Sequence, residues 1–333
     1  MKSILEAGNL KNKRVLVRVD WNVPFDNSSG QATVADDFRI RESMLTIENL
    51  LSRGAKVILA THLEAGISVE PLKKFLPSEV ELLENLRNDP REVANDESFA
   101  KELASRADIF VNEAFSVCHR GHASIVSVPK LLPSYAGLHL EKEVKELSKA
   151  FNPEPPFLLI IGGAKFETKL SLIKKFIEIA DEIFVGGALA HNFFKEQGAD
   201  IKNSLVSDGN FNLESLLATE KIILPKDLVW LGDKIVDAGP ETLNDLKMRL
   251  EKAKLVIWNG PLGNFEIGYG VATRELAKLI TNSKANSIIG GGDTLAAIKN
   301  ENLLDKFSFV STGGGAMLDF LANGTLPGIE ALN

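Results

Sequence analysis

The stretch LIIGGAKFETK (residues 159–169) runs from an apolar segment into two glycines, and then into a segment with two lysines four residues apart. The same change occurs three more times, in FVGGALA (184–190), IIGGGDT (288–294) and VSTGGGA (310–316). Runs that are apolar throughout are typical of parallel strands covered on both faces. The pattern predicts strands alternating with helices, and therefore an α/β fold with ligands at the carboxyl ends of the strands.

The length of the chain and a helical segment near its middle predict two domains. At 333 residues the chain exceeds one average hydrophobic core, and its 44% hydrophobic content supports more than one. Residues 136–151 place apolar side chains on one helical face, and the sequence NPEPP (152–156) that follows must end any helix. We therefore expect a domain boundary near residue 150, after a connecting helix over 136–151.

Charge and cysteine content exclude several classes of protein. The net charge of -7 argues against a nucleic-acid partner, which would need a basic surface. Cys118 is the only cysteine, so no intrachain disulfide forms and a reducing compartment is the natural setting. The first ten residues lack the apolar region of a secretory signal, and no apolar run approaches the ~18 residues of a membrane helix. We expect a cytoplasmic protein without a membrane partner.

Arginine and glycine are distributed unequally along the chain. Nine arginines lie in residues 1–150 and two lie after them, whereas glycine runs the other way, with 6 against 20. Arginine offers a planar set of donors for carboxylates and phosphate esters, while glycine lets backbone N–H groups approach a ligand closely. The two halves are therefore expected to hold different ligands.

The four glycine turns indicate an anion site in the second half. One such turn is weak support, because glycine commonly serves tight strand-to-helix turns. Four at one sheet edge are a stronger indication, since helix N-termini present N–H groups and a partial positive charge that suit a polyphosphate. Residues 159–169 match neither the P-loop nor the dinucleotide pattern G-x-G-x-x-G, so the motif alone does not identify the ligand.

Charged residues beside these turns allow a functional and a structural interpretation. Lys165 and Lys169 would add positive charge over phosphates, or would lie on the solvated first turn of a surface helix. Asp293 and Thr294 would cap a helix, or the Asp293 carboxylate would hold magnesium together with phosphate oxygens. Glu266, in VIWNGPLGNFE (256–266), would accept from ribose hydroxyls or face water.

Polar and cationic residues in the first half follow the ends of apolar runs. Parallel strands would bring seven of them to one sheet edge: Asp20, Asn22, His62, Arg87, His119, Arg120 and His122. Each alone is more often structural, as a turn residue, a surface arginine or a buried histidine. No G-x-S-x-G motif suggests a hydrolase, and the histidine spacing is not that of a helical zinc site.

Eight motifs in one order resemble the phosphoglycerate kinase family from end to end: RVDWNVP, LLENLR, VNEAF, HRGHAS, GGAKFETK, WNGPLGNFE, GGGDT and STGGGA. The resemblance implies two Rossmann-like lobes with parallel sheets, joined by a helix. The acid would bind the first lobe (1–150) and the nucleotide the second (151–323), with a C-terminal tail (324–333) that returns to the first. It also implies a monomer that closes about a hinge and reversibly transfers a phosphoryl group between 1,3-bisphosphoglycerate and MgADP, giving 3-phosphoglycerate and MgATP.

The resemblance implies site residues on both lobes. The contacts to 3-phosphoglycerate would be Asp20, Asn22, Arg39, His62, Arg87 and Arg120. The nucleotide contacts would be Gly162, Gly163, Lys165, Lys169, Gly186, Asn259, Pro261, Glu266, Gly291, Gly292, Asp293 and Thr294, with Asp293 at the Mg²⁺ ion. The catalytic groups would be Arg39, Lys165, Lys169 and Gly314. Arg39 would be the first-lobe cation that meets the transferring phosphoryl group.

The chain departs from the family's pattern at four places. The stretch EAG (64–66) stands where the family usually has Gly-Arg-Pro, so one phosphate-binding arginine is missing at Ala65. Only 18 residues separate Ala65 from Glu84, which indicates the loss of a helix-strand unit from the first lobe. Thr168 stands where the family prefers Asp, and Ile235 lies in a trimmed segment where glycine is common.

Three other functions stay open on these residues. Ala65 would suit a kinase that uses another small carboxylate or acyl phosphate. The departures would also suit a nucleotide-binding regulatory protein with weak or lost turnover. A nicotinamide dehydrogenase is the least favoured, since no G-x-G-x-x-G opens a helix in the expected unit.

Overall fold

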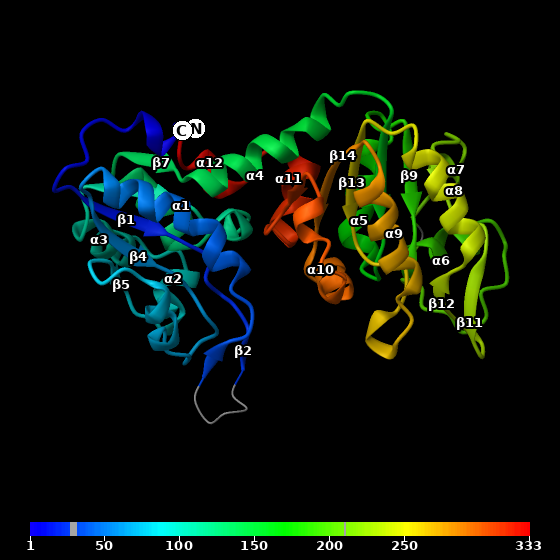
Figure 1. Cartoon of the computed structure of the whole chain (residues 1–333), viewed down its shortest axis with the longest axis horizontal. Helices are drawn as coiled ribbons and strands as arrows, with labels where there is room; N and C mark the ends of the chain where they lie inside the picture. The colour runs from blue at the N-terminus through cyan, green and yellow to red at the C-terminus, as the bar shows by residue number, and fades with distance from the viewer. Residues whose placement is uncertain (27–31, 210) are drawn as a thin grey trace. The chain divides into compact units, whose positions relative to one another are not determined.

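The computed structural model describes residues 1–26, 32–209 and 211–333. These residues form two compact units, which Figure 1 shows. Unit 1 consists of Met1–Lys145 together with Thr325–Asn333, and unit 2 consists of Glu146–Gly324. The expected connecting helix is α4 (Leu138–Ser148), so the chain passes from one unit to the other inside that helix.

Unit 1 is built on a parallel sheet in the order β5-β4-β1-β6-β7. Its strands are β1 (Arg14–Arg18), β4 (Lys56–Ala60), β5 (Glu81–Leu82), β6 (Ile109–Asn112) and β7 (Ser134–Ala136). A separate two-stranded hairpin pairs β2 (Phe25–Asp26) with β3 (Thr33–Val34). The first strand lies in the middle and the chain then fills one side before the other, which creates a crevice for ligands at the carboxyl end of β1.

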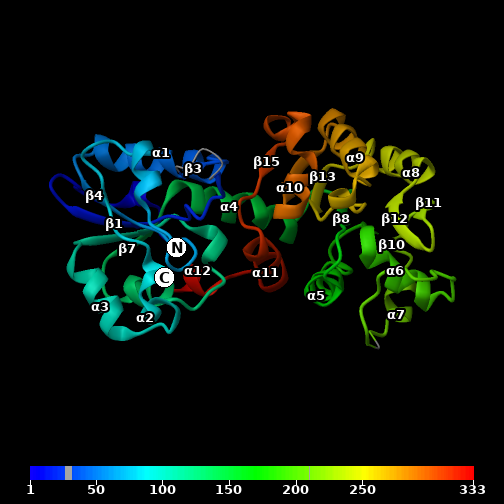
Figure 2. The ribbon, with the colours of Figure 1, turned by 90° about the horizontal axis from the view of Figure 1, so that it is seen from below.

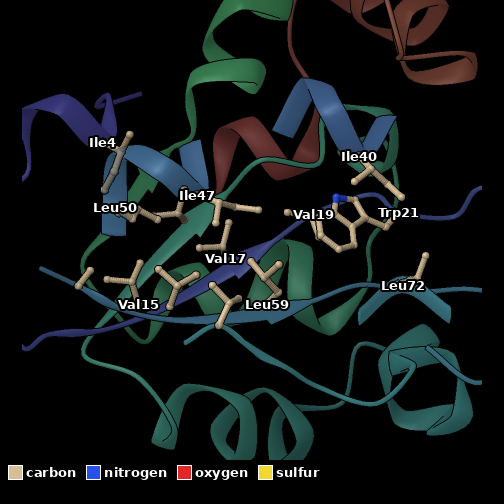
Figure 3. Packing of buried hydrophobic residues seen from close by; sticks show 14 of the residues in the cluster. Ile4, Val15, Val17, Val19, Trp21, Ile40, Ile47, Leu50, Leu59 and Leu72 are labelled. Atoms are coloured by element: carbon tan, nitrogen blue, oxygen red, sulfur yellow. The ribbon is translucent and has the colours of Figure 1, made fainter. Parts of the chain in front are cut away.

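Helices cover the sheet of unit 1. They are α1 (Phe38–Ser52), α2 (Pro90–Val93), α3 (Glu97–Ser105), α4 and the C-terminal α12 (Pro327–Glu330). Figure 3 shows Val15, Val17 and Leu59 of the sheet packed beneath Ile47 and Leu50 of α1. The C-terminal segment belongs to this unit, because the N–H of its Gly328 donates to the Cys118 carbonyl at 2.8 Å.

Unit 2 contains a parallel sheet in the order β10-β9-β8-β13-β14-β15. The strands are β8 (Phe157–Ile161), β9 (Glu182–Val185), β10 (Ile222–Ile223), β13 (Leu255–Asn259), β14 (Asn286–Gly290) and β15 (Phe309–Val310). A separate antiparallel pair consists of β11 (Leu228–Leu231) and β12 (Lys234–Ala238). The predicted α/β class with parallel sheets is confirmed in both units.

Each of the four glycine turns joins a strand of this sheet to a helix. The helices of unit 2 are α5 (Phe166–Phe176), α6 (Gly187–Glu196), α7 (Glu214–Leu217), α8 (Pro240–Leu250), α9 (Val271–Asn282), α10 (Gly292–Ile298) and α11 (Gly315–Asn323). In Figure 2, α8, α9 and α10 lie along one side of the strands, and α5 and α11 lie along the other. Because all the strands are parallel, the four turns meet at one edge of the sheet, as predicted.

Candidate active site

In unit 1, the predicted acid-binding residues Asp20, Asn22 and Arg39 lie together beyond the carboxyl end of β1. Nη1 of Arg39, on α1, is 2.8 Å from Oδ2 of Asp20 and donates to the Asn22 carbonyl at 3.2 Å. The Ser116 hydroxyl also donates to Asp20. Burial alone would raise the pKa of Asp20, but the charge of Arg39, the hydrogen bond from Ser116 and the charge of Arg18 hold that pKa below its ordinary value. Asp20 is therefore a fixed carboxylate that orients Arg39.

His62 follows β4 and is held by Arg18, a residue that the sequence interpretation missed. Arg18 is fully buried, and its Nη2 lies 3.0 Å from Nδ1 of His62. Burial and the charge of Arg18 hold the pKa of His62 far below its ordinary value, so the ring is neutral. Because a guanidinium can only donate, Nδ1 accepts and Nε2 carries the hydrogen. His62 thus presents an N–H donor, as an anionic ligand requires.

A second layer of buried polar residues supports Arg18. Its Nε donates to Oγ of Ser124 at 2.8 Å, and Ser124 donates to the buried Glu92 carboxylate through its hydroxyl at 2.6 Å. One signal in the sequence could have revealed this network. Arg18 ends the otherwise apolar run VLV (15–17), where a cation is expensive to bury unless it has partners.

Arg87 and Arg120 supply positive charge that no carboxylate of the described part of unit 1 pairs with directly. Arg87 lies in a 3₁₀ turn (Leu86–Asn88) after β5, and Arg120 follows the segment after β6. Burial and the nearby Arg120 charge lower the pKa of Arg87. Among the described residues, neither guanidinium forms an ion pair with a carboxylate. Two cations near each other repel, and a bound anion would relieve that repulsion.

In unit 2, the glycine turns pack backbone against backbone. The N–H groups of Gly162, Gly163 and Gly186 donate to the carbonyls of Asn259, Pro261 and Ile161 at 2.8–2.9 Å. A Cβ at Gly162 would lie 2.3 Å from the Pro261 carbonyl oxygen. Close packing between the turns uses these three N–H groups, so the contacts predicted between these glycines and a nucleotide would involve other atoms.

Lys169 lies inside this packing and not on a solvated helix surface. Its side chain is buried, and Nζ donates to the Gly162 carbonyl. Burial, with a smaller effect of the neighbouring Lys165 charge, lowers the pKa of Lys169 to about 8 against the opposing effect of Asp293. Lys165 itself is exposed at the start of α5. The two lysines therefore differ, since Lys169 is a positioned amine and Lys165 is free to move in solvent.

A cavity of about 320 Å³ opens at the same sheet edge of unit 2. The expected nucleotide contacts Gly163, Pro261, Glu266 and Asp293 line it. Other expected contacts are not among the residues that line it: Gly162, Lys169, Gly186, Asn259, Gly291, Gly292 and Thr294. Thr294, for example, is buried and its hydroxyl accepts from the Gly260 N–H at 2.7 Å. The sequence interpretation missed the wall residues His191, Leu205, Leu228 and Asp237.

Two more expected residues occupy the starts of helices. Asp293 lies in the first turn of α10, whose N-cap is Gly291, so its carboxylate does not cap the helix. Gly314 precedes α11 with a φ of 53°, a conformation that favours glycine.

No three histidine, cysteine, aspartate or glutamate side chains gather as metal ligands within the described residues. No helix of the described chain is both long and apolar enough to cross a membrane.

Comparison with known proteins gives one consistent result. The family model described as phosphoglycerate kinase matches residues 5–76 and 65–324. Phosphoglycerate kinase from Leptospira biflexa is 36% identical to the chain over 394 residues, and that from Dictyoglomus turgidum is 39% identical over 394 residues. Each alignment covers 99% of this chain and 98% of the relative. The solved structure of phosphoglycerate kinase from Coxiella burnetii has a TM-score of 0.88 at 33% identity and covers 99% of this chain and 98% of its own.

The alignments also show that the chain is shorter than its relatives. Because it has 333 residues, at least 61 of the 394 aligned positions have no residue here. The two parts of the family match meet at residues 65–76, which follow β4 and include the 3₁₀ turn Glu70–Phe75. The connection between β4 and β5 is therefore one place where this chain differs from the family model.

Proposed function

Because the chain belongs to the phosphoglycerate kinase family, we propose that it binds the acid on unit 1 and the nucleotide on unit 2. The reaction is reversible phosphoryl transfer between 1,3-bisphosphoglycerate and MgADP, giving 3-phosphoglycerate and MgATP. One observation best supports the assignment of the acid to unit 1 and the nucleotide to unit 2. The neighbouring cations Arg87 and Arg120 lie in unit 1, while the cavity with apolar walls and the carboxylates Glu266 and Asp293 lies in unit 2. A coupled assay with 3-phosphoglycerate and MgATP tests the proposal.

On the acid side, each group has a role that follows from its geometry. Arg87 and Arg120 bind the ester phosphate, since each guanidinium offers several donors to phosphate oxygens. The N–H of His62 adds a donor whose direction is fixed by Arg18. The Asp20 carboxylate accepts from the hydroxyl of the acid, and the side-chain amide of Asn22 donates to its carboxylate. Arg39 is oriented by Asp20, with its side chain 35% exposed and accessible to a ligand.

On the nucleotide side, the apolar walls Leu205, Leu228 and Ile235 hold the base and Glu266 accepts from the ribose. Lys165 and Lys169 neutralise the phosphates from two sides of the first glycine turn. Mg²⁺ would accompany the nucleotide, and Asp293 would be its protein ligand. One carboxylate at the cavity wall fits this role, because Mg²⁺ commonly takes one or two carboxylates and shares its other positions with phosphate and water.

The chemistry requires positioning and charge stabilisation only. In the direction of ATP use, a carboxylate oxygen of 3-phosphoglycerate forms a bond to the γ-phosphorus while the bond to the β-phosphate oxygen breaks. No proton moves and no covalent enzyme intermediate forms. The two oxygens must lie in line, with the attacking oxygen about 3 to 3.5 Å from phosphorus. Arg39 and Lys169 stabilise the charge on the phosphoryl group as it moves.

Ala65→Arg should tighten 3-phosphoglycerate binding about tenfold and leave MgATP affinity unchanged, because it adds a charge-assisted contact to the ester phosphate. The side chain of Asn85 bonds to the Glu64 and Ile67 carbonyls at 2.8 and 2.9 Å, which fastens the loop of residue 65 to the turn that carries Arg87. Calorimetric titration with the acid measures the effect.

Three other arginines of unit 1 are candidates to replace the missing cation at residue 65. All three are already engaged: Arg41 with Asp37, Arg53 with main-chain carbonyls and Arg91 with Asp89 and Glu102. If Ala65→Arg gives no gain, and alanine at one of these arginines causes a large loss of acid affinity, the missing arginine has been replaced and this prediction is wrong.

A different small carboxylate is a second candidate acceptor, and one observation favours it. A cavity of about 570 Å³ in unit 1 is lined by Asn22 and by Leu63, Glu64, Ile67 and Pro71, which belong to or flank the shortened connection. A larger acid would have room beside Asn22 there. Turnover with other carboxylic acids, measured against 3-phosphoglycerate in the same assay, distinguishes the two acceptors.

A further inference from the structure

His191 is a wall residue of the unit 2 cavity to which no role has yet been given. It lies on α6, four residues after Gly187, the first residue of that helix. Only 4% of its surface is exposed. Its Nδ1 is 2.8 Å from the main-chain carbonyl oxygen of Leu205, which lines the same cavity. Within the described residues, the structure gives this ring no other hydrogen bond.

The contact with Leu205 determines where the imidazole hydrogen lies. A carbonyl oxygen can only accept, so Nδ1 carries the hydrogen and donates it. Burial lowers the pKa of His191, so the ring is neutral at physiological pH, although the bond to Leu205 opposes this effect. A neutral imidazole with a hydrogen on Nδ1 has a lone pair on Nε2. His191 therefore offers a hydrogen-bond acceptor in the cavity wall.

Neighbouring contacts place this acceptor at the apolar end of the cavity. Oγ of Ser204 accepts from the Ile235 N–H at 2.9 Å, so the segment that carries Leu205 is tied both to β12 and to His191. Leu205 and Ile235 are thus wall residues of one corner. Asp293, at the start of α10, lies beside Lys169 and the glycine turns instead. An aromatic base, and not a phosphate, suits a corner with apolar walls and a neutral acceptor.

We propose that His191 selects the nucleotide base by accepting, at Nε2, a hydrogen bond from the exocyclic amine of a 6-aminopurine. A 6-oxopurine such as hypoxanthine presents a carbonyl oxygen at that position, which would place two acceptors opposite each other in a buried site. Such a mismatch leaves both groups unsatisfied, and sites of this kind discriminate strongly between donor and acceptor. This inference rests on the proposed binding of the nucleotide in the unit 2 cavity.

His191 could instead serve only to hold the cavity wall, and a matched control separates the two roles. Asn192, the next residue, is also buried and its side-chain oxygen accepts from the Ser207 N–H at 3.2 Å. It ties the same segment to α6 but does not line the cavity. Asn192→Ala therefore loosens the wall and leaves the acceptor of His191 in place.

The test compares the affinities for MgADP and MgIDP by calorimetry in the full chain. The native protein should bind MgADP about tenfold more tightly than MgIDP, because the adenine amine donates a hydrogen bond to His191 and the hypoxanthine oxygen cannot. His191→Phe, which keeps a ring of similar size, should bring this ratio close to one. His191→Gln, which keeps an acceptor, should retain part of the preference. Asn192→Ala should weaken both nucleotides alike and leave the ratio unchanged.

The outcomes that overturn the inference differ from those that overturn the proposed site. Equal affinities of the native protein for MgADP and MgIDP, or an unchanged ratio of these affinities in a folded His191→Phe variant, would show that His191 does not select the base. Either result would leave the proposed nucleotide site unaffected. The comparison of MgADP with MgIDP in the native protein needs no variant. It therefore tests the inference even if His191→Phe fails to fold. Absence of MgADP binding in the native protein would overturn both.

Discussion

Arg39→Ala should lower turnover about 10²- to 10³-fold while MgADP affinity stays within about twofold of the native value. The guanidinium is held by Asp20 at 2.8 Å and by the Asn22 carbonyl, so it is oriented before any ligand arrives. We propose that its main partner is charge that develops on the phosphoryl group during transfer. An interaction of that kind acts on the rate and not on the resting nucleotide complex.

Steady-state kinetics and calorimetric titration of MgADP test this prediction together. Arg41→Ala is a suitable control, because Arg41 lies on the same helix with a side chain 67% exposed and pairs only with Asp37 among the described residues. It should leave both quantities unchanged. Near-native turnover in Arg39→Ala would remove Arg39 from the mechanism, and an equal loss in Arg41→Ala would point to damage to α1.

Lys169→Met should lower turnover about 100-fold or more and should weaken MgADP binding, while the free energy of unfolding stays the same or rises. The amine is buried among the glycine turns, so methionine of similar length fills its space without leaving an unpaired charge. The loss of function reflects a missing charge-assisted contact with the phosphates. Turnover, MgADP titration and chemical denaturation measure the three effects.

Charge at residue 169 also predicts a pH dependence with a definite sign. Burial lowers the pKa of Lys169 to about 8, so the free protein loses this charge as the pH rises through 8, and MgADP affinity should fall there. Lys169→Arg keeps its charge and should show a flat profile over the same range. Lys174→Met, on the exposed face of α5, should behave like the native protein. A native profile identical to that of Lys169→Arg would contradict the assignment.

Much of the architecture could be predicted because apolar runs and glycine turns are local signals. The runs before residues 162, 186, 290 and 313 predicted parallel strands, and parallel strands must bring their carboxyl ends to one edge. The same reasoning brought Asp20 to the edge where His62 follows β4. These predictions needed only the order of elements along the chain and not the details of packing.

What the sequence could not provide depends on long-range packing. The N–H groups of Gly162 and Gly163 are used by the turn after β13, about 100 residues away in the chain, and no local pattern records such a contact. Lys169 and Arg18 are long polar side chains that a sequence pattern assigns to the surface, yet both are buried with partners. His191 was missed because its role depends on the carbonyl of Leu205.

The most direct test of the account is the rate of ADP formation from MgATP by the native protein as 3-phosphoglycerate is varied. If unit 1 retains its acid site despite the shortened connection, the rate should rise with acid concentration to a plateau and should be negligible without the acid. Normal MgATP binding with no acid-dependent ADP formation at any concentration of 3-phosphoglycerate would contradict the account and would support a nucleotide-binding protein without turnover.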